Sequence, residues 1–127
     1  MKPFPDKFEL ISFFESRPAL LDPHVDWYYN HLTFITTDNA DRIECEIEPA
    51  NLLMKLRWYR DGSELVNLNL EVVTGLKIEN RGGKESLRAT FSETSGIGSL
   101  LIQLKPSIHV FMELKISGLD VRDFYKT

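Results

Sequence analysis

The chain has little cysteine and no long apolar segment. Cys45 is the only cysteine among its 127 residues, so no internal disulfide can form and nothing points to an oxidising compartment. Every apolar run is far shorter than the ~20 residues that cross a bilayer. The first residues, Met1–Asp6, also lack the basic and then apolar pattern of a signal peptide. We therefore expect a cytoplasmic protein without a membrane partner, and this length predicts a single domain over residues 1–127.

Recognisable catalytic, metal-binding and cofactor-binding patterns are also missing. The spacing of the three histidines favours surface or turn positions over a metal or acid–base site: His24, His31 and His109. Cys45 stands between Glu44 and Glu46, whose charge raises the pKa of a thiol, so we expect a small buried residue rather than a nucleophile. The segment Ser95–Ser99 lacks the Lys-Ser or Lys-Thr pair of a phosphate-binding loop. The sequence thus predicts no enzyme, no metal and no cofactor.

Negative charge is present but unevenly distributed. The net charge is −4, yet residues 1–50 carry ten acids and four bases, whereas residues 51–127 carry nine acids and eleven bases. Five acids fall in one short segment: Asp38, Asp41, Glu44, Glu46 and Glu48. An acidic patch disfavours nucleic acid, because phosphate contacts need clustered Lys and Arg. It favours a basic protein partner through long-range attraction.

The N-terminal segment predicts a short helix over residues 6–16. Asp6 and Glu9 have the spacing of a capping box, and Arg17-Pro18 ends the segment. The apolar residues recur at helical spacing: Phe8, Leu10, Ile11, Phe13 and Phe14. The alternative is an extended strand, since runs rich in phenylalanine also suit sheets.

Period-two alternation dominates after residue 24. It predicts strands over residues 25–36, 43–48, 54–59, 66–72, 76–78, 87–91, 100–104 and 108–116, with Leu119–Tyr125 as a strand or a helical turn. Turn signals separate these runs: Asp38–Asp41, Asp61-Gly62 and Asn80–Lys84, with a possible bulge at Gly75. The spacing is typical of a mostly β fold, an antiparallel β-sandwich or partly open barrel of seven to nine strands.

The strand over residues 43–48 has one apolar face and one wholly acidic face. Ile43, Cys45 and Ile47 alternate with Glu44, Glu46 and Glu48. Three interpretations stay open. Bases of the next strand pair with the row, the row is a solvated edge that resists aggregation, or the row is a functional acidic surface. The bases concerned are Lys55, Arg57 and Arg60.

Aromatic residues cluster on two of the predicted strands. Alternation places Tyr28 opposite Trp27 and Tyr29, and it places Tyr59 opposite Trp58. At least half of these rings are expected in the core, and some lie on an outer face. Tyrosine and tryptophan are enriched at binding hot spots, so Tyr28 and Tyr59 join the candidate partner-binding residues.

The features together resemble a known class of proteins. These features are the length, the acidity, the missing catalytic site and the segment HVDWYYNHLTFITTDNADRIECEIE with the sheet-like repeats after it. They are similar to small acidic immunity proteins of bacterial contact-dependent inhibition and other polymorphic-toxin systems. The resemblance implies a protein that binds a cognate toxin domain, often a basic nuclease, and blocks its active site. It assigns no role to any single residue.

Two function classes therefore remain. The first is a protein-binding module that captures a basic partner through Glu44, Glu46, Glu48, Asp38, Asp41, Tyr28 and Tyr59. The second is a small-ligand carrier or barrel-like enzyme in which apolar side chains, such as those of residues 108–116, line a cavity. The sequence leaves the oligomeric state open.

Overall fold

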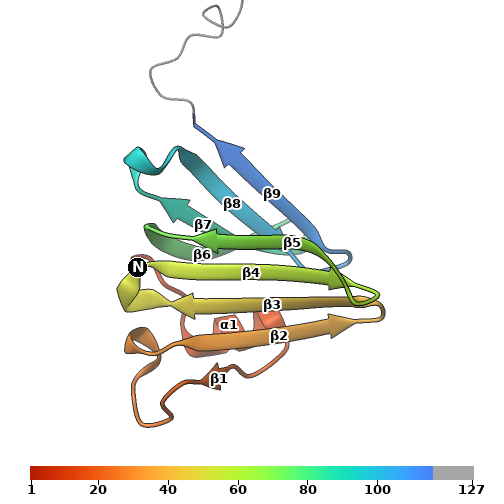
Figure 1. Cartoon of the computed structure of the whole chain (residues 1–127), viewed down its shortest axis with the longest axis horizontal. Helices are drawn as coiled ribbons and strands as arrows, with labels where there is room; N and C mark the ends of the chain where they lie inside the picture. The colour runs from red at the N-terminus through yellow and green to blue at the C-terminus, as the bar shows by residue number, and fades with distance from the viewer. Residues whose placement is uncertain (116–127) are drawn as a thin grey trace, which may run out of the picture.

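The computed structural model describes residues 1–115, which form two antiparallel sheets and one α-helix (Figure 1). The first sheet has the order β1-β2-β3-β4-β5 and the second β6-β7-β8-β9. Their strands are β1 (Ala19–Leu20), β2 (Leu32–Asp38), β3 (Asp41–Glu48), β4 (Leu53–Arg60), β5 (Ser63–Leu70), β6 (Val73–Arg81), β7 (Lys84–Phe91), β8 (Ile97–Gln103) and β9 (His109–Leu114). The helices are α1 (Lys7–Phe14) and the short 3-10 helices η1 (Trp27–Tyr29), η2 (Pro49–Asn51) and η3 (Glu93–Ser95). The predicted mostly-β fold with a short N-terminal helix is confirmed, as a sandwich of two sheets and not a closed barrel.

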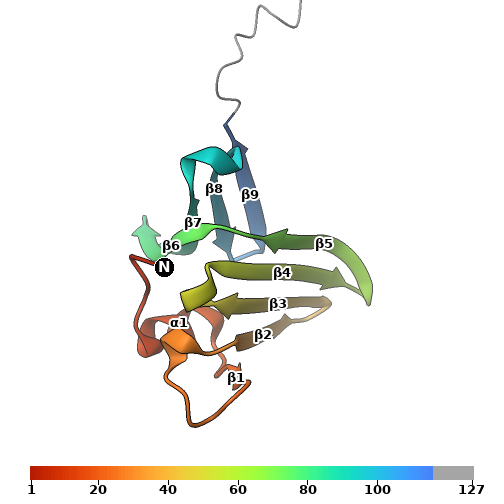
Figure 2. The same cartoon turned by 60° about the vertical axis from the view of Figure 1, so that its left-hand side comes forward.

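The core lies between the two sheets and includes one side of α1. The helix contacts β2 and β7, and Figure 2 shows it against β2 and β3. The ring of Phe14 stacks on that of Phe34 in β2 with centroids 4.4 Å apart, which fixes the helix on the first sheet. Fully buried side chains come from both sheets and the helix: Leu10, Phe14, Phe34, Ile47, Leu87 and Ile102.

Three of the hairpins are closed by turns that the sequence predicted, Asp38–Asp41, Asp61-Gly62 and Asn80–Lys84. Asp61 and Gly62 connect β4 to β5 with φ of 50° and 79°. Gly82 and Gly83 connect β6 to β7 with φ of 59° and 81°. Two successive residues with positive φ form a type I′ turn, whose twist matches the right-handed twist of the two strands that it connects. These turns set the register of the strands on either side.

The helix begins as predicted but ends earlier. The Asp6 carboxylate accepts a hydrogen bond from the Glu9 amide at 2.8 Å, and the Glu9 carboxylate accepts one from the Asp6 amide at 3.2 Å. The helix ends at Phe14, because Glu15 takes a left-handed conformation with φ of 52°. The helix buries three side chains: Leu10, Phe13 and Phe14. Phe8, predicted on the same apolar side, is 82% exposed.

Residues 25–36 are not one strand, so this prediction was wrong. Trp27–Tyr29 forms η1, and β2 starts only after it. The cause is Asn30, which is buried and whose side-chain amide donates to the carbonyl oxygens of Asp22 at 2.6 Å and Val25 at 3.0 Å. These local bonds close a turn and outweigh the strand propensity of the aromatic residues.

Smaller differences occur elsewhere in the chain. The two-residue strand β1 was not predicted, and the end of the segment Ser95–Ser99 belongs to β8. The bulge predicted at Gly75 is present, because the β6–β7 register shifts between Val73 and Gly75. The predictions for Ile116 and for Leu119–Tyr125 lie outside the described residues.

Candidate protein-binding surface

The outer side of the first sheet carries the predicted acidic row on β3. The side chains of Glu44, Glu46 and Glu48 are 22%, 23% and 28% exposed. The alternate residues of β3 face the core and have no exposed surface: Ile43, Cys45 and Ile47. Strict alternation on a strand paired on both sides produces this division. We call the outer side of β2, β3 and β4 the charged face.

Basic side chains of the same protein lie beside the acidic row. Register places Arg57 of β4 opposite Glu44, and its Nη1 lies 3.9 Å from Glu44 Oε2 and 3.7 Å from Glu46 Oε2. Arg42 Nη2 lies 2.8 Å from Glu44 Oε1. Lys55 is the register partner of Glu46. The predicted cross-strand neutralisation is therefore present at Arg57, and the charged face presents stripes of both signs.

His31, which was predicted only as a surface or turn residue, completes this network. Its Nε2 lies 2.9 Å from Glu46 Oε1, and its Nδ1 lies 3.2 Å from Glu48 Oε1. Partial burial lowers the pKa of His31, but hydrogen bonds to Glu48 and Glu46 and the charges of both outweigh it, so the net pKa is raised. A usable signal existed: the β2–β3 register pairs Asp38 with Asp41, and counting back along that hairpin brings His31 opposite Glu48.

Asp41 and Asp38 lie at the end of the β2–β3 hairpin and not on the charged face. Asp41 Oδ1 accepts hydrogen bonds from Arg60 Nε at 2.9 Å and from Trp58 Nε1 at 3.0 Å. The bond from Arg60, followed by that from Trp58, lowers the pKa of Asp41. Arg60 also lies over the Trp58 ring at 5.3 Å. Asp41 therefore stabilises the end of the sheet. Arg60, which was one of the bases considered as partners of the glutamates of β3, pairs with Asp41 instead.

The two candidate tyrosines occupy different parts of the molecule. Tyr59 lines a hollow of about 330 Å³ on the charged face, together with Arg42 and Glu44. Tyr28 lies in η1, where its hydroxyl accepts a hydrogen bond from the N-terminal amine of Met1 at 2.7 Å. The alternation assumed for residues 27–29 does not apply in a 3-10 helix, and Tyr29 is the ring that is 72% exposed.

The seven predicted residues thus separate into three groups. Glu44, Glu46, Glu48 and Tyr59 share the charged face, whereas Asp38 and Asp41 lie at the hairpin end and Tyr28 holds the N-terminus. Cys45 is buried as predicted, and burial, with the charge of Glu46, raises its pKa. Within residues 1–115, no three His, Cys, Asp or Glu side chains are placed to hold a metal ion. None of the helices in that range has the length and apolar character to cross a membrane.

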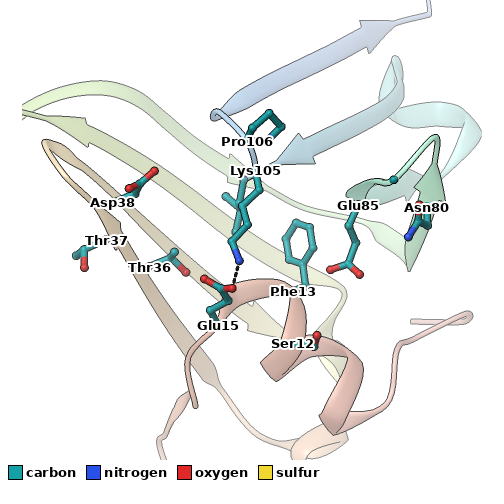
Figure 3. A pocket seen from close by; sticks show the side chains of 12 residues that line it. Ser12, Phe13, Glu15, Thr36, Thr37, Asp38, Asn80, Glu85, Lys105 and Pro106 are labelled. Carbon is teal, nitrogen blue, oxygen red and sulfur yellow. Dashed lines mark ion pairs between the residues drawn. The ribbon is translucent and has the colours of Figure 1, made fainter.

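A second hollow, which sequence reasoning missed, forms where α1, β2 and the turns β6–β7 and β8–β9 meet (Figure 3). This cleft of about 740 Å³ is open to solvent. Three carboxylates and one ammonium line it: Glu15, Asp38, Glu85 and Lys105. Lys105 forms an ion pair with Glu15 at the carboxyl end of α1, where a cation complements the helix dipole. These residues come from four distant segments, so no local pattern announces the cleft.

Comparison with known proteins gives a likeness in fold. No family model matches this chain, and no curated protein matches it in sequence. A chain of the solved contact-dependent growth inhibition toxin–immunity protein complex from Klebsiella pneumoniae 342 is similar to it, with a TM-score of 0.72 and 16% identity. The match covers 87% of this chain and 94% of that chain. The protein therefore shares the fold of a chain found in a toxin–immunity complex.

Proposed function

We propose that this protein is an immunity protein that binds and neutralises a cognate toxin domain. The observation that carries the proposal is the fold shared, over almost the whole of both chains, with a chain of a contact-dependent growth inhibition toxin–immunity complex. The resemblance in length and acidity supports the same class from the sequence alone. In this role the protein acts by binding, in the cytoplasm, and not by catalysis.

The charge of the chain favours the inhibitor over the toxin of such a pair. The net charge is −4, and the basic side chains Arg42 and Arg57 are already engaged with glutamates. A nuclease needs unpaired basic side chains against phosphate, whereas an inhibitor of a basic nuclease needs carboxylates. We therefore propose a basic toxin domain, with nuclease activity as the leading case.

The charged face is the surface that we propose for the toxin. It combines the row Glu44, Glu46 and Glu48 with the hollow lined by Tyr59, and buried aromatic anchors beside charged groups are typical of binding hot spots. Because Arg57 runs alongside the row, a partner must present both signs in matching positions. Such stripes give register and specificity more than raw affinity.

The small-ligand alternative receives no specific support. A carrier would need an enclosed, mainly apolar cavity with a few polar groups to orient the ligand. The cleft at the carboxyl end of α1 is open to solvent and lined by Glu15, Glu85 and Lys105 among others. We therefore retain toxin binding as the proposal.

The general function is tested by co-expression. The gene is expressed together with a candidate toxin, the variable C-terminal domain of a large secreted protein, for which the genome around this gene is searched. We expect restored growth and a complex of the two proteins that survives gel filtration. Growth arrest that persists although both proteins are made and folded contradicts the immunity role.

The surface is tested with two variants of equal charge change. One carries Glu44→Gln, Glu46→Gln and Glu48→Gln; the control carries Asp26→Asn, Glu71→Gln and Glu93→Gln at exposed positions away from the charged face. We expect the first to slow association with the toxin domain about tenfold at low salt, and the control to leave it nearly unchanged. Stopped-flow association rates measure this. Equal rates for the two variants contradict the proposed surface, while leaving the immunity role intact.

A further inference from the structure

Among the described residues, the two sheets end in four edge strands, β1, β5, β6 and β9, and the edges of β5 and β6 are shielded. An edge strand presents unpaired backbone N–H and C=O groups, and proteins shield such edges by shortness, bulges or covering segments. β5 carries a register shift opposite Trp58 and Tyr59. β1 has two residues and leaves Phe34–Asp38 of β2 without a strand partner on that side. At the edge of β6, Lys2 N donates to Thr74 O at 2.8 Å and Leu76 N donates to Pro3 O at 2.9 Å.

Glycine at position 75 makes the covering of β6 possible. A Cβ there would lie 2.8 Å from the carbonyl oxygen of Lys2 and 2.9 Å from the ring of Pro3. The N-terminal segment therefore lies directly against β6, and its own end is held by Tyr28. The edge of β6 is thus built to be closed by the same chain.

The edge of β9 differs from the shielded edges of β5 and β6 within the described residues. It has six residues, lies at the outer border of its sheet in Figure 1, and contains neither proline nor lysine. Its apolar side chains are largely exposed, with Phe111 at 59%, Met112 at 37% and Leu114 at 65%. The β8–β9 pair also has a register shift, but its extra residue is Gly98 of β8, so β9 itself has no bulge. An exposed apolar edge of this kind is suited to pairing with another strand.

The sequence of β9 is complementary to itself in the antiparallel direction. His109 and Glu113 stand two residues on either side of Phe111, and all three side chains are exposed on one face. A two-fold axis at Phe111 places His109 opposite Glu113 of the partner subunit, and Phe111 opposite Phe111 of the partner subunit. An imidazole facing a carboxylate can form a cross-strand hydrogen bond, and facing aromatics are a favourable cross-strand pair. His109 already stacks on Phe111 with centroids 5.9 Å apart, so the two rings form one surface.

We propose that β9 is a homodimerisation edge, at which two copies of this chain join their second sheets into one continuous eight-stranded sheet. The proposal is independent of toxin binding and goes beyond it. The interface is isologous, as a two-fold axis requires, because residues 109–113 of each copy pair with the same residues of the other copy. Two short strands bury less surface than a permanent dimer needs, so the association is weak and depends on protein concentration.

A charge-swap series tests the proposed register. His109→Glu places two glutamates opposite each other at both ends of the paired strands, whereas His109→Glu with Glu113→Lys restores opposite charges. Residues 109 and 113 lie about 13 Å apart within one strand, so the second change cannot act mainly within its own chain. Sedimentation equilibrium should show a reversible wild-type dimer, a dimer Kd about tenfold higher for the single variant, and recovery in the double variant.

Cysteine cross-linking checks the geometry independently of affinity. Register partners have Cβ atoms about 5 Å apart, within reach of a disulfide after small adjustment. His109→Cys mixed with Glu113→Cys should therefore form a mixed disulfide, while each variant alone stays uncross-linked. Cys45 does not interfere, because it is fully buried.

Several results overturn the proposal. They are a wild-type protein that stays monomeric up to millimolar concentration, a double variant as weak as the single one, or cross-linking of either cysteine variant with itself. A monomer whose β9 variants weaken the toxin complex instead assigns this edge to a strand of the toxin. That result refutes the homodimer without touching the proposed immunity function.

Discussion

β3 and β9 look alike in sequence and differ completely in environment. Apolar residues recur at every second position of both strands, and Phe111 adds an apolar side chain on the other face of β9. Ile43, Cys45 and Ile47 are nevertheless fully buried, whereas Leu114 of β9 is 65% exposed. β3 is paired on both sides and covered on its inner face, whereas β9 is the last strand of its sheet. Alternation therefore predicts a strand, and neighbours decide how much that strand contributes to stability.

The polar faces of these strands differ in the same way. On β3, Glu46 lies within ion-pair distance of both His31 and Arg57. On β9, His109 bonds to nearby Ser107, with 2.9 Å between Nε2 and Oγ, and Glu113 is exposed. A central strand finds partners for its charges in its own chain. An edge strand leaves charges available to another chain.

The largest expected effect is on the apolar faces. Ile47→Ala should lower the free energy of unfolding by about 3 kcal/mol, because it opens a cavity in the core. Leu114→Ala should lower it by less than about 0.5 kcal/mol, because the side chain is mostly in water. Urea denaturation at low protein concentration measures both. Similar losses of stability in the two variants would mean that Leu114 is buried in solution, and they would contradict the difference in burial between β3 and β9.

A smaller effect is expected on the charges. Arg57→Gln should cost about 0.5 kcal/mol, since it leaves Glu44 and Glu46 facing each other with less compensation, while solvent screens much of the interaction. Glu113→Gln should be nearly neutral for the monomer. The same denaturation series at low and high salt measures this. A loss at Arg57 that salt does not reduce would show that packing, and not charge, explains it.

An effect no larger than that of Arg57 is expected as a pH dependence at His31. Its pKa is higher in the folded protein than the ordinary 6.5, so its stabilising effect is complete below that value and is lost as the pH rises through the folded pKa. The stability difference between wild type and His31→Gln should therefore be larger at pH 5.5 than at pH 8, by about 0.5 kcal/mol. Thermal melts at both pH values measure it.

A second background provides the control for His31. In a protein that already carries Glu46→Gln and Glu48→Gln, the pH dependence of the His31→Gln effect should vanish or reverse its sign, because the carboxylates that raise the pKa are absent and partial burial alone lowers it. A pH dependence of the original sign and size in this background would assign the titration to another group.

Sequence reasoning worked where the chain interacts with itself locally. The capping box at Asp6, the turn at Asp61-Gly62 and the alternation of β3 depend on residues a few positions apart. It failed at η1, where the buried side chain of Asn30 closes a turn that no propensity for aromatic residues announces. It also missed His31, because the ring meets Glu46 only through the register of a hairpin.

The sequence by itself determined that the chain is a mostly β protein with an acidic row on one strand, because side-chain periodicity and turn chemistry are local properties. Only the tertiary structure decided what that row meets. Strand register places Arg57 and His31 beside the glutamates. Sheet order places β3 between two strands and β9 at an edge. The packing of the chain places the Tyr28 hydroxyl against the N-terminal amine of Met1. The neutralisation of the acidic row and the exposure of each strand depend on residues distant in sequence. For that reason they could not be predicted from the sequence alone.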